Sequence, residues 1–162
     1  MQPVLDTLDV ACTLSDNAQV RFAAMCAEFT ADNAAALSAL CQRLRIPNNF
    51  SEAALQSARF TEQAHDALKM NAEQLHTLIK SLDVARRGDR FNDFLVAAQA
   101  HHQTTRTESD NYPQAKHLRA CASAMASIDA AQIAKSQTDK SQIATAIKRH
   151  EINAIEAYLS TH

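Results

Sequence analysis

Apolar residues recur at intervals of three and four through most of the chain, the spacing that places them on one face of an α-helix. The first such stretch covers residues 3–14. The second, which Ser15 or Asp16 is expected to cap, is apolar around nearly its whole circumference, as in a buried helix. The pattern predicts about eight helices in all, the others spanning roughly 33–46, 51–68, 71–87, 89–102, 113–125 and 139–159.

Residues with strong backbone preferences mark the ends of these helices. Pro47 is expected to stop the third helix, and Pro113 fits the first turn of the seventh. Asn71 is expected to cap the fifth helix. Gly88 is expected just beyond the end of that helix, where a left-handed backbone favours glycine. The polar stretch 103–111 predicts a loop or a frayed turn.

Composition narrows the fold class to all-α. The 162 residues include 32 alanines and one glycine. Alanine favours helices, whereas sheets and phosphate-binding loops need glycines for their turns. Alanine also lets helix axes approach closely, so leucine, isoleucine and phenylalanine must provide most of the core. No apolar run is long enough to span a membrane, and no fixed repeat is present.

The net charge limits the binding partners that can be expected, and the cysteines indicate the cellular compartment. A net charge of -2 and a pI near 6.4 give no general attraction to nucleic acid or to anionic membranes. The N-terminus has neither a basic region nor an apolar signal core. Four cysteines without CxxC spacing predict reduced core thiols and a cytoplasmic protein; they are Cys12, Cys26, Cys41 and Cys121.

The residues alone indicate no catalytic constellation. Glu62 and Asp66 share a helical face beside His65, which is typical of a solvated surface, and the seven histidines are expected to be solvated as well. His101 and His102 are adjacent and point about 100° apart on a helix, so they do not easily share one ion. The prediction is no metal, no cofactor and no nucleophile.

Basic residues form small groups near predicted helix ends. Arg43 and Arg45 are one group, and Arg86, Arg87 and Arg90 are a second, around Gly88. Arginines there interact favourably with the helix dipole and the last carbonyls. The alternative is a local contact with phosphate, hidden within a nearly neutral average. A third group is Lys148, Arg149 and His150.

Three strings resemble the C-terminal half of bacterial CCA-adding enzymes (tRNA nucleotidyltransferases): residues 21–26 (RFAAMC), 41–48 (CQRLRIPN) and 109–114 (SDNYPQ). That half of the family carries an HD-superfamily phosphohydrolase domain followed by a helical tail. The resemblance therefore implies an HD-domain-like helical bundle at 1–104. It also implies a C-terminal helical extension at 105–162, packed on that bundle as one compact unit.

The same resemblance implies that the metal site has been lost. HD phosphohydrolases hold a metal ion through a first histidine, a His-Asp pair and a distant aspartate. These positions fall on Pro3, on Ala27 and Glu28, and on His101. The histidines that follow the pair in the family are expected to be deleted here. The family's nucleotidyltransferase head, with its paired acidic metal ligands, is also missing from this sequence.

The expected function is that of a non-catalytic HD-like domain that binds RNA, such as tRNA or a tRNA-like RNA, or a protein partner. One alternative is the tRNA-binding body of a split or truncated CCA-adding enzyme. Another is a helical oligomerisation module without a role in nucleic-acid binding. A third is residual hydrolase activity around Glu28, His101 and His102. Neither nucleotidyltransferase nor metal-dependent phosphohydrolase chemistry is expected of this sequence by itself.

Overall fold

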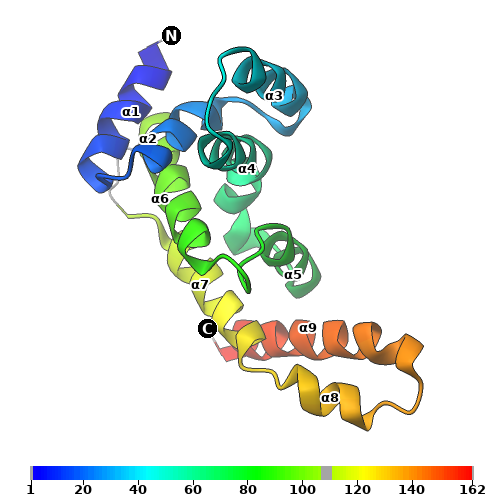
Figure 1. Ribbon diagram of the computed structural model, residues 1–162. Coiled ribbons are helices and arrows are strands. Elements are labelled where there is room, and N and C mark those ends of the chain that lie inside the picture. Colours follow the sequence, from blue (N-terminus) through cyan, green and yellow to red (C-terminus); the bar gives the residue numbers. More distant parts are fainter. Residues whose placement is uncertain (1, 107–110, 162) are drawn as a thin grey trace.

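A computed structural model describes residues 2–106 and 111–161, and every regular element in these ranges is a helix (Figure 1). The all-α prediction is therefore confirmed. None of these helices is long and apolar enough to cross a membrane. The α-helices are α1 (Gln2–Leu14), α2 (Ala18–Met25), α3 (Ala34–Arg43), α4 (Asn48–His65), α5 (Ala72–Ser81), α6 (Gly88–Thr105), α7 (Pro113–Ala126), α8 (Ala130–Ser136) and α9 (Ile143–Thr161), and the short 3-10 helices are η1 (Cys26–Glu28), η2 (Ala31–Asn33), η3 (Ala67–Lys69) and η4 (Lys140–Gln142).

Helices α1 to α4 gather at one end of the molecule, and α8 and α9 lie together at the other (Figure 1). Helix α6 packs against α1, α2 and α4. Helix α7 packs against α9, α5 and η3. The two central helices α6 and α7 therefore connect both ends. Arg106, at the end of α6, and Tyr112, directly before α7, both contact side chains at the end of α4.

Two predicted helix starts are confirmed in detail. Asn71 Oδ1 accepts a hydrogen bond from the Gln74 amide at 2.9 Å, and Gln74 Oε1 accepts one from the Asn71 amide at 3.0 Å. This reciprocal pair is a capping box, which satisfies two amides that the helix itself leaves unpaired. Pro113 is the first residue of α7, where its missing amide hydrogen costs nothing.

The prediction for Gly88 is wrong. Helix α5 ends at Ser81, and the left-handed residue beyond it is Asp83, with φ of 52°. Gly88 begins α6 instead and has no positive φ. Aspartate tolerates the left-handed region better than most residues, so the chain turns here without glycine. Leu82, the residue that caps α5, continues the apolar face of the helix and is 1% exposed.

Other boundaries also differ from the prediction. Asn17, rather than Ser15 or Asp16, caps α2, because its side chain accepts from the Gln19 amide at 3.0 Å. The pattern missed α8, which Asp129 caps through the Gln132 amide. Helix α8 has no buried residue and so produces no apolar stripe. Within the predicted loop 103–111, α6 continues to Thr105, and residues 107–110 lie outside the described residues.

The largest core cluster combines residues from 64–98 with residues from 112–155. Its largest fully buried side chains include Leu75, Leu95, Leu118 and Ile155, and burial of each contributes about 1.5–3 kcal/mol. A smaller cluster lies where α1, α2 and α6 meet, and it is built mainly from alanines. Small side chains bring these helix axes close together, as the composition indicated; the alanines are Ala11, Ala23, Ala24, Ala97 and Ala100.

The cysteine prediction is right for three thiols and wrong for one. Cys26, Cys41 and Cys121 are buried, whereas Cys12 is exposed on α1. Ala11 lies on the apolar stripe of α1 that packs against α6 and α2, and Cys12, the next residue, points to solvent. Burial raises the pKa of Cys26 to about 12 and that of Cys121 to about 11, which further suppresses their thiolate forms.

We therefore expect one fast-reacting thiol per folded chain. At mildly alkaline pH a disulfide reagent should modify Cys12 rapidly, and the three buried thiols should react only as fast as the chain opens. Absorbance of the released thiol measures this, with four equivalents expected in denaturant. The Cys12→Ser variant is the control and should lose the fast phase. Any fast-reacting thiol left in that variant would contradict the burial of the other three cysteines.

Candidate functional site

Two histidines predicted to be solvated are buried where α4 and α6 end and α7 begins. His65 is the last residue of α4, and His101 lies near the end of α6. Tyr112 directly precedes α7 and joins them. These three side chains are 4%, 5% and 6% exposed, so the solvated prediction is wrong for both histidines. It is also wrong for His76, which is buried on α5 against the carboxylate of Glu151.

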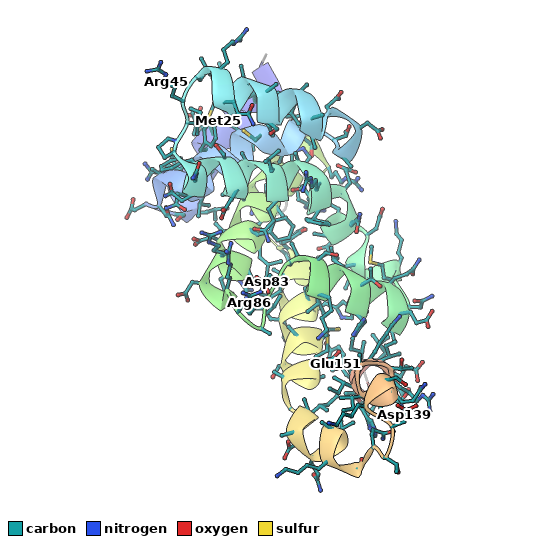
Figure 2. The ribbon with its side chains drawn as sticks, turned by 45° about the vertical axis from the view of Figure 1, so that its right-hand side comes forward. Met25, Arg45, Asp83, Arg86, Asp139 and Glu151 are labelled. Carbon is teal, nitrogen blue, oxygen red and sulfur yellow. The ribbon has the colours of Figure 1, made fainter. Side chains whose placement is uncertain are left out.

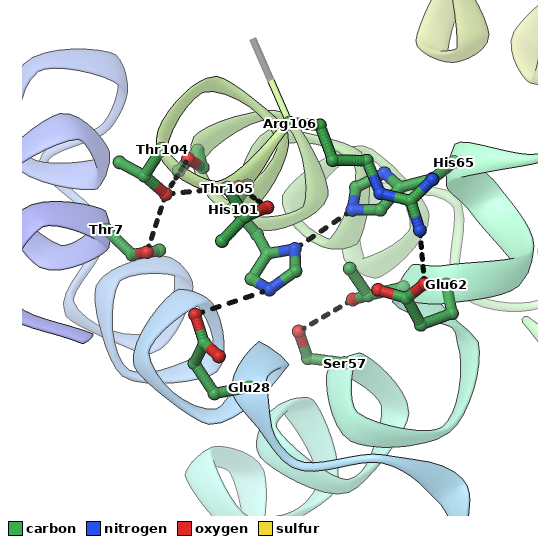
Figure 3. Close-up of polar contacts among 11 residues, drawn as sticks. Thr7, Glu28, Ser57, Glu62, His65, His101, Thr104, Thr105 and Arg106 are labelled. Carbon is green, nitrogen blue, oxygen red and sulfur yellow. Dashed lines mark hydrogen bonds and ion pairs between the residues drawn. The ribbon is translucent and has the colours of Figure 1, made fainter. Parts of the chain in front are cut away.

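The three rings form a hydrogen-bonded chain. Nδ1 of His65 lies 2.9 Å from the Tyr112 hydroxyl, and its Nε2 lies 2.9 Å from Nδ1 of His101. The two imidazoles are nearly parallel, with ring centres 5.2 Å apart. On its other side, Nε2 of His101 lies 3.6 Å from a carboxylate oxygen of Glu28 (Figure 3). Segments far apart in the sequence thus meet through one row of polar groups.

Burial keeps these groups uncharged. Removal from water is the main cause that lowers the pKa of His65 to about 3, and His101 and Arg106 act in the same direction. Burial also lowers the pKa of His101, although Glu28 and Glu62 oppose it. The pKa of the Tyr112 hydroxyl is raised by burial. At neutral pH this hydrogen-bonded row of side chains therefore consists of two neutral imidazoles and a protonated phenol.

The position of Glu28 sets the direction of the hydrogen bonds. A carboxylate only accepts, so the N–H of His101 is placed on Nε2, towards Glu28. Nδ1 of His101 then accepts from Nε2–H of His65, whose Nδ1 accepts from the Tyr112 hydroxyl. Beside this chain, Nδ1 of His102 is buried without a hydrogen-bond partner among the described residues, and its ring centre lies 5.1 Å from that of Tyr112.

Glu62 lies on the solvent-exposed side of the pair formed by His65 and His101. It lies one turn before His65 on α4, and its exposed carboxylate pairs with the guanidinium of Arg106 (Figure 3). One ligand atom each from Glu62, His65 and His101 lie within 4.8 Å of one another. Glu62 is exposed, as predicted, whereas the burial of His65 and His101 was missed, because nothing local in the sequence shows that α6 packs across the end of α4.

The positions at which the resemblance places metal ligands do not fit an HD-type metal centre. Pro3 and Ala27 have no side-chain atom that can bind a metal. Glu28 and His101 do lie together, but two ligands alone do not hold and activate a metal-bound water. Near them, the Thr7 and Thr104 hydroxyls are hydrogen-bonded at 2.7 Å and tie α1 to α6 (Figure 3).

The five arginines singled out from the sequence do not form one patch. Arg43 lies in the last turn of α3, and Arg45 follows it, exposed and left-handed with φ of 52°. The amides of Arg45 and Ile46 close the helix end on the carbonyls of Gln42 and Cys41, a Schellman motif. Figure 2 shows the Arg45 side chain at the outer edge of the α3 end, far from Arg86.

Arg87 and Arg90 lie in a groove between α4 and the start of α6. Both pair with the carboxylate of Glu52, with Arg87 Nη1 at 3.2 Å. These arginines lower the pKa of Glu52 mainly through the hydrogen bond from Arg90. Arg59, which is not among the arginines predicted to contact phosphate, lines the same groove. It lies seven residues after Glu52 on one helix, a spacing that places both on the same face and was the available signal.

The remaining basic residues lie elsewhere. Arg86 lines a different hollow, beside Val84 and Met125. The group at residues 148–150 is exposed on α9, at the end of the molecule away from α3 and α4 (Figure 1). The structure therefore assembles Arg59, Arg87 and Arg90 in one groove, with Arg45 in a neighbouring hollow. Arg43 and Arg86 line neither of them.

Comparison with known proteins places the chain beside one group of bacterial enzymes. The multifunctional CCA protein of Nitrosococcus oceani is 29% identical over 174 aligned positions, which cover 97% of this chain and 43% of that protein. The multifunctional CCA protein of Cupriavidus metallidurans is 37% identical, covering 74% of this chain and 29% of its own length. The CCA-adding enzyme of Pseudomonas putida W619 is 30% identical, with 76% and 33% covered.

The chain thus spans less than half the length of these curated relatives. No family model matches it, and no solved structure matches it.

Proposed function

Because this chain is homologous to part of the bacterial CCA-adding enzymes, we propose that it is a non-catalytic, HD-like helical domain that binds tRNA or a tRNA-like RNA. The observation that carries the proposal is the groove containing Arg59, Arg87 and Arg90. Arginine binds phosphate oxygens through its planar fork of N–H groups, and such contacts dominate the affinity of proteins for nucleic acids.

The groove has the composition of a backbone-binding surface. Its three arginines face two carboxylates, Glu52 and Asp83, so it is locally basic in a chain whose net charge is -2. The ion pairs with Glu52 hold the guanidinium groups at the surface in one orientation. The partly buried ring of Phe60 lines the same groove and provides an aromatic surface for a base.

A neighbouring hollow extends this surface towards the end of α3. Arg45 and Asn48 line that hollow, and Leu55 borders both it and the groove. A ribose-phosphate strand lying along α4 would therefore pass the groove and then reach Arg45. The absence of ligand atoms at Pro3 and Ala27 supports a binding role rather than HD-type hydrolysis.

The competing proposal of an assembly module rests on less. The large apolar side chains that are exposed among the described residues are scattered over α1, the end of α3 and η3 rather than gathered in one patch; they are Leu5, Leu14, Leu44 and Leu68. Single exposed leucines are ordinary on protein surfaces.

The test is binding of fluorescently labelled tRNA transcripts, followed by anisotropy at about 50 and 200 mM KCl. The double variant Arg87→Gln/Arg90→Gln should bind more weakly. Its plot of log affinity against log salt should be shallower by about 1.4–1.8, since each lost phosphate contact removes about 0.7–0.9. The matched control is Arg119→Gln/Arg149→Gln, which removes the same charge from exposed sites on α7 and α9.

Two results would overturn the proposal. The first is no tRNA binding by the unaltered chain at the lower salt concentration. The second is an equal loss of affinity in both double variants, because only a general charge effect gives that result.

A further inference from the structure

Three side chains able to bind a metal ion converge between α4 and α6. Glu62 and His65 lie one turn apart on α4, and His101 faces them from α6 (Figure 3). We propose that these residues form a binding site for one divalent transition-metal ion, with Zn²⁺ as its occupant. The set shares only His101 with the positions that the family resemblance assigns to an HD-type metal.

The chemistry and spacing of the ligands fit such an ion. Two imidazoles and one carboxylate with a further open position are a common zinc ligand set. With metal–ligand bonds of about 2.0–2.2 Å, neighbouring ligand atoms lie about 3.3 Å apart. Nε2 of His65 and Nδ1 of His101 are already 2.9 Å apart. All three ligand atoms lie within 4.8 Å, and the exposed Glu62 side chain can move the last ångström or so.

The second ring nitrogen of each imidazole, which is not a proposed ligand atom, also has a polar neighbour. Nε2 of His101 points to the Glu28 carboxylate at 3.6 Å, and Nδ1 of His65 lies 2.9 Å from the Tyr112 hydroxyl. Zinc-binding histidines usually donate their second N–H to a carboxylate or another acceptor, which fixes the ring and its tautomer. Glu28 and Tyr112 therefore orient the two imidazoles in the way that metal-binding histidines are usually oriented.

Binding requires a shift of one proton and no net loss of protons. Without metal, His65 carries its proton on Nε2, between the two rings. The ion is coordinated by the lone pairs of His65 Nε2 and His101 Nδ1, so the His65 proton must move to its Nδ1. From there His65 Nδ1–H donates a hydrogen bond to the Tyr112 oxygen. The Tyr112 hydroxyl hydrogen then needs another acceptor, and Nδ1 of His102 is buried nearby without a partner among the described residues.

Arg106 limits the strength of the site. Its guanidinium pairs with the Glu62 carboxylate, which must be released, at least in part, for an ion to bind. Removing this competitor should therefore raise metal affinity about two- to fivefold, the equivalent of one exposed ion pair. A histidine pair that served only to hold the helices together would show no such gain.

The test is titration of the full, EDTA-treated chain with ZnCl₂ by calorimetry, and with CoCl₂ by visible absorption. The Cys12→Ser background removes the exposed thiol. We expect one ion per chain and cobalt bands without thiolate charge transfer. Loss of a partner that only orients a ligand usually costs about 10–100-fold in metal affinity, so removing a ligand itself should cost at least about 100-fold in His101→Gln and at least about 10-fold in Glu62→Gln, whose side chain is exposed. Arg106→Gln should strengthen it, and His150→Gln, at an exposed histidine, should leave it unchanged.

Circular dichroism reports whether each variant folds. If His101→Gln is unfolded, the exposed-site variants Glu62→Gln and Arg106→Gln decide the question through their opposite effects on affinity. The proposal is overturned if the unaltered chain shows no saturable binding of Zn²⁺ near one ion per chain. It is equally overturned if Glu62→Gln and Arg106→Gln bind as the unaltered chain does.

Discussion

Leu118→Ala is expected to lower the free energy of unfolding by about 2–5 kcal/mol. Leu118 is fully buried on α7 and belongs to the core cluster that combines residues of 64–98 with residues of 112–155. Helix α7 packs against α5, η3 and α9. Truncation leaves a cavity at this junction that the surrounding helices can only partly close, so lost burial and lost packing both contribute.

Urea unfolding followed by circular dichroism measures this loss. Leu68→Ala is the matched control, since Leu68 is 52% exposed in η3 and its truncation should change stability by less than about 0.5 kcal/mol. Tyrosine fluorescence is a second probe, because Tyr112 and Tyr158 both belong to or pack on the same core cluster. A loss below about 1 kcal/mol in Leu118→Ala would contradict the central position of α7.

The sequence predicted those parts of the fold that depend on local interactions. The capping box of Asn71 and the first-turn position of Pro113 depend on residues within one turn, and both are present. Gly88 shows where such local rules stop. The position beyond α5 accepts Asp83 in a left-handed conformation, so the one glycine did not mark the end of that helix.

The candidate sites depend on packing between segments distant in the sequence. His65 and His101 are 36 residues apart and meet only because α6 lies against α4. Periodicity shows which face of a helix is apolar, but a histidine carries no sign of burial in its immediate neighbours. The groove was missed for the same reason, since Arg59 lies on α4 whereas Arg87 and Arg90 come after α5.

The family resemblance contributed information that periodicity did not. It set Glu28 and His101 at corresponding ligand positions although 73 residues separate them, and these side chains are in contact. It gave no reason to single out Glu62 or His65. The resemblance thus drew attention to one end of the buried polar row, and the packing of α4 against α6 supplied the rest.

Acidification of the metal-free chain from about pH 7 to about pH 5 is expected to lower the free energy of unfolding by about 2 kcal/mol through His65 alone. Burial lowers the pKa of His65 from 6.5 to about 3, so below pH 6.5 the unfolded chain binds a proton that the folded chain excludes. The stability is complete above the unfolded pKa and is lost as pH falls towards the folded one. The lowered pKa values of His101 and His102 act in the same direction.

Urea unfolding at several pH values, with EDTA present, measures the slope. The other titrating groups are the same in the two variants compared, His65→Gln and His150→Gln, so the difference between their slopes isolates the contribution of His65. In His65→Gln the slope of the unfolding free energy against pH should be smaller by the contribution of one proton, about 1.4 kcal/mol per pH unit at its steepest. This holds whatever the stability of the variant at neutral pH. His150→Gln, which alters an exposed histidine, should keep the full slope. Equal slopes in the two variants would mean that His65 takes up its proton as readily in the folded chain as in the unfolded chain, and the neutral hydrogen-bonded row from Tyr112 to His101 would then be wrong.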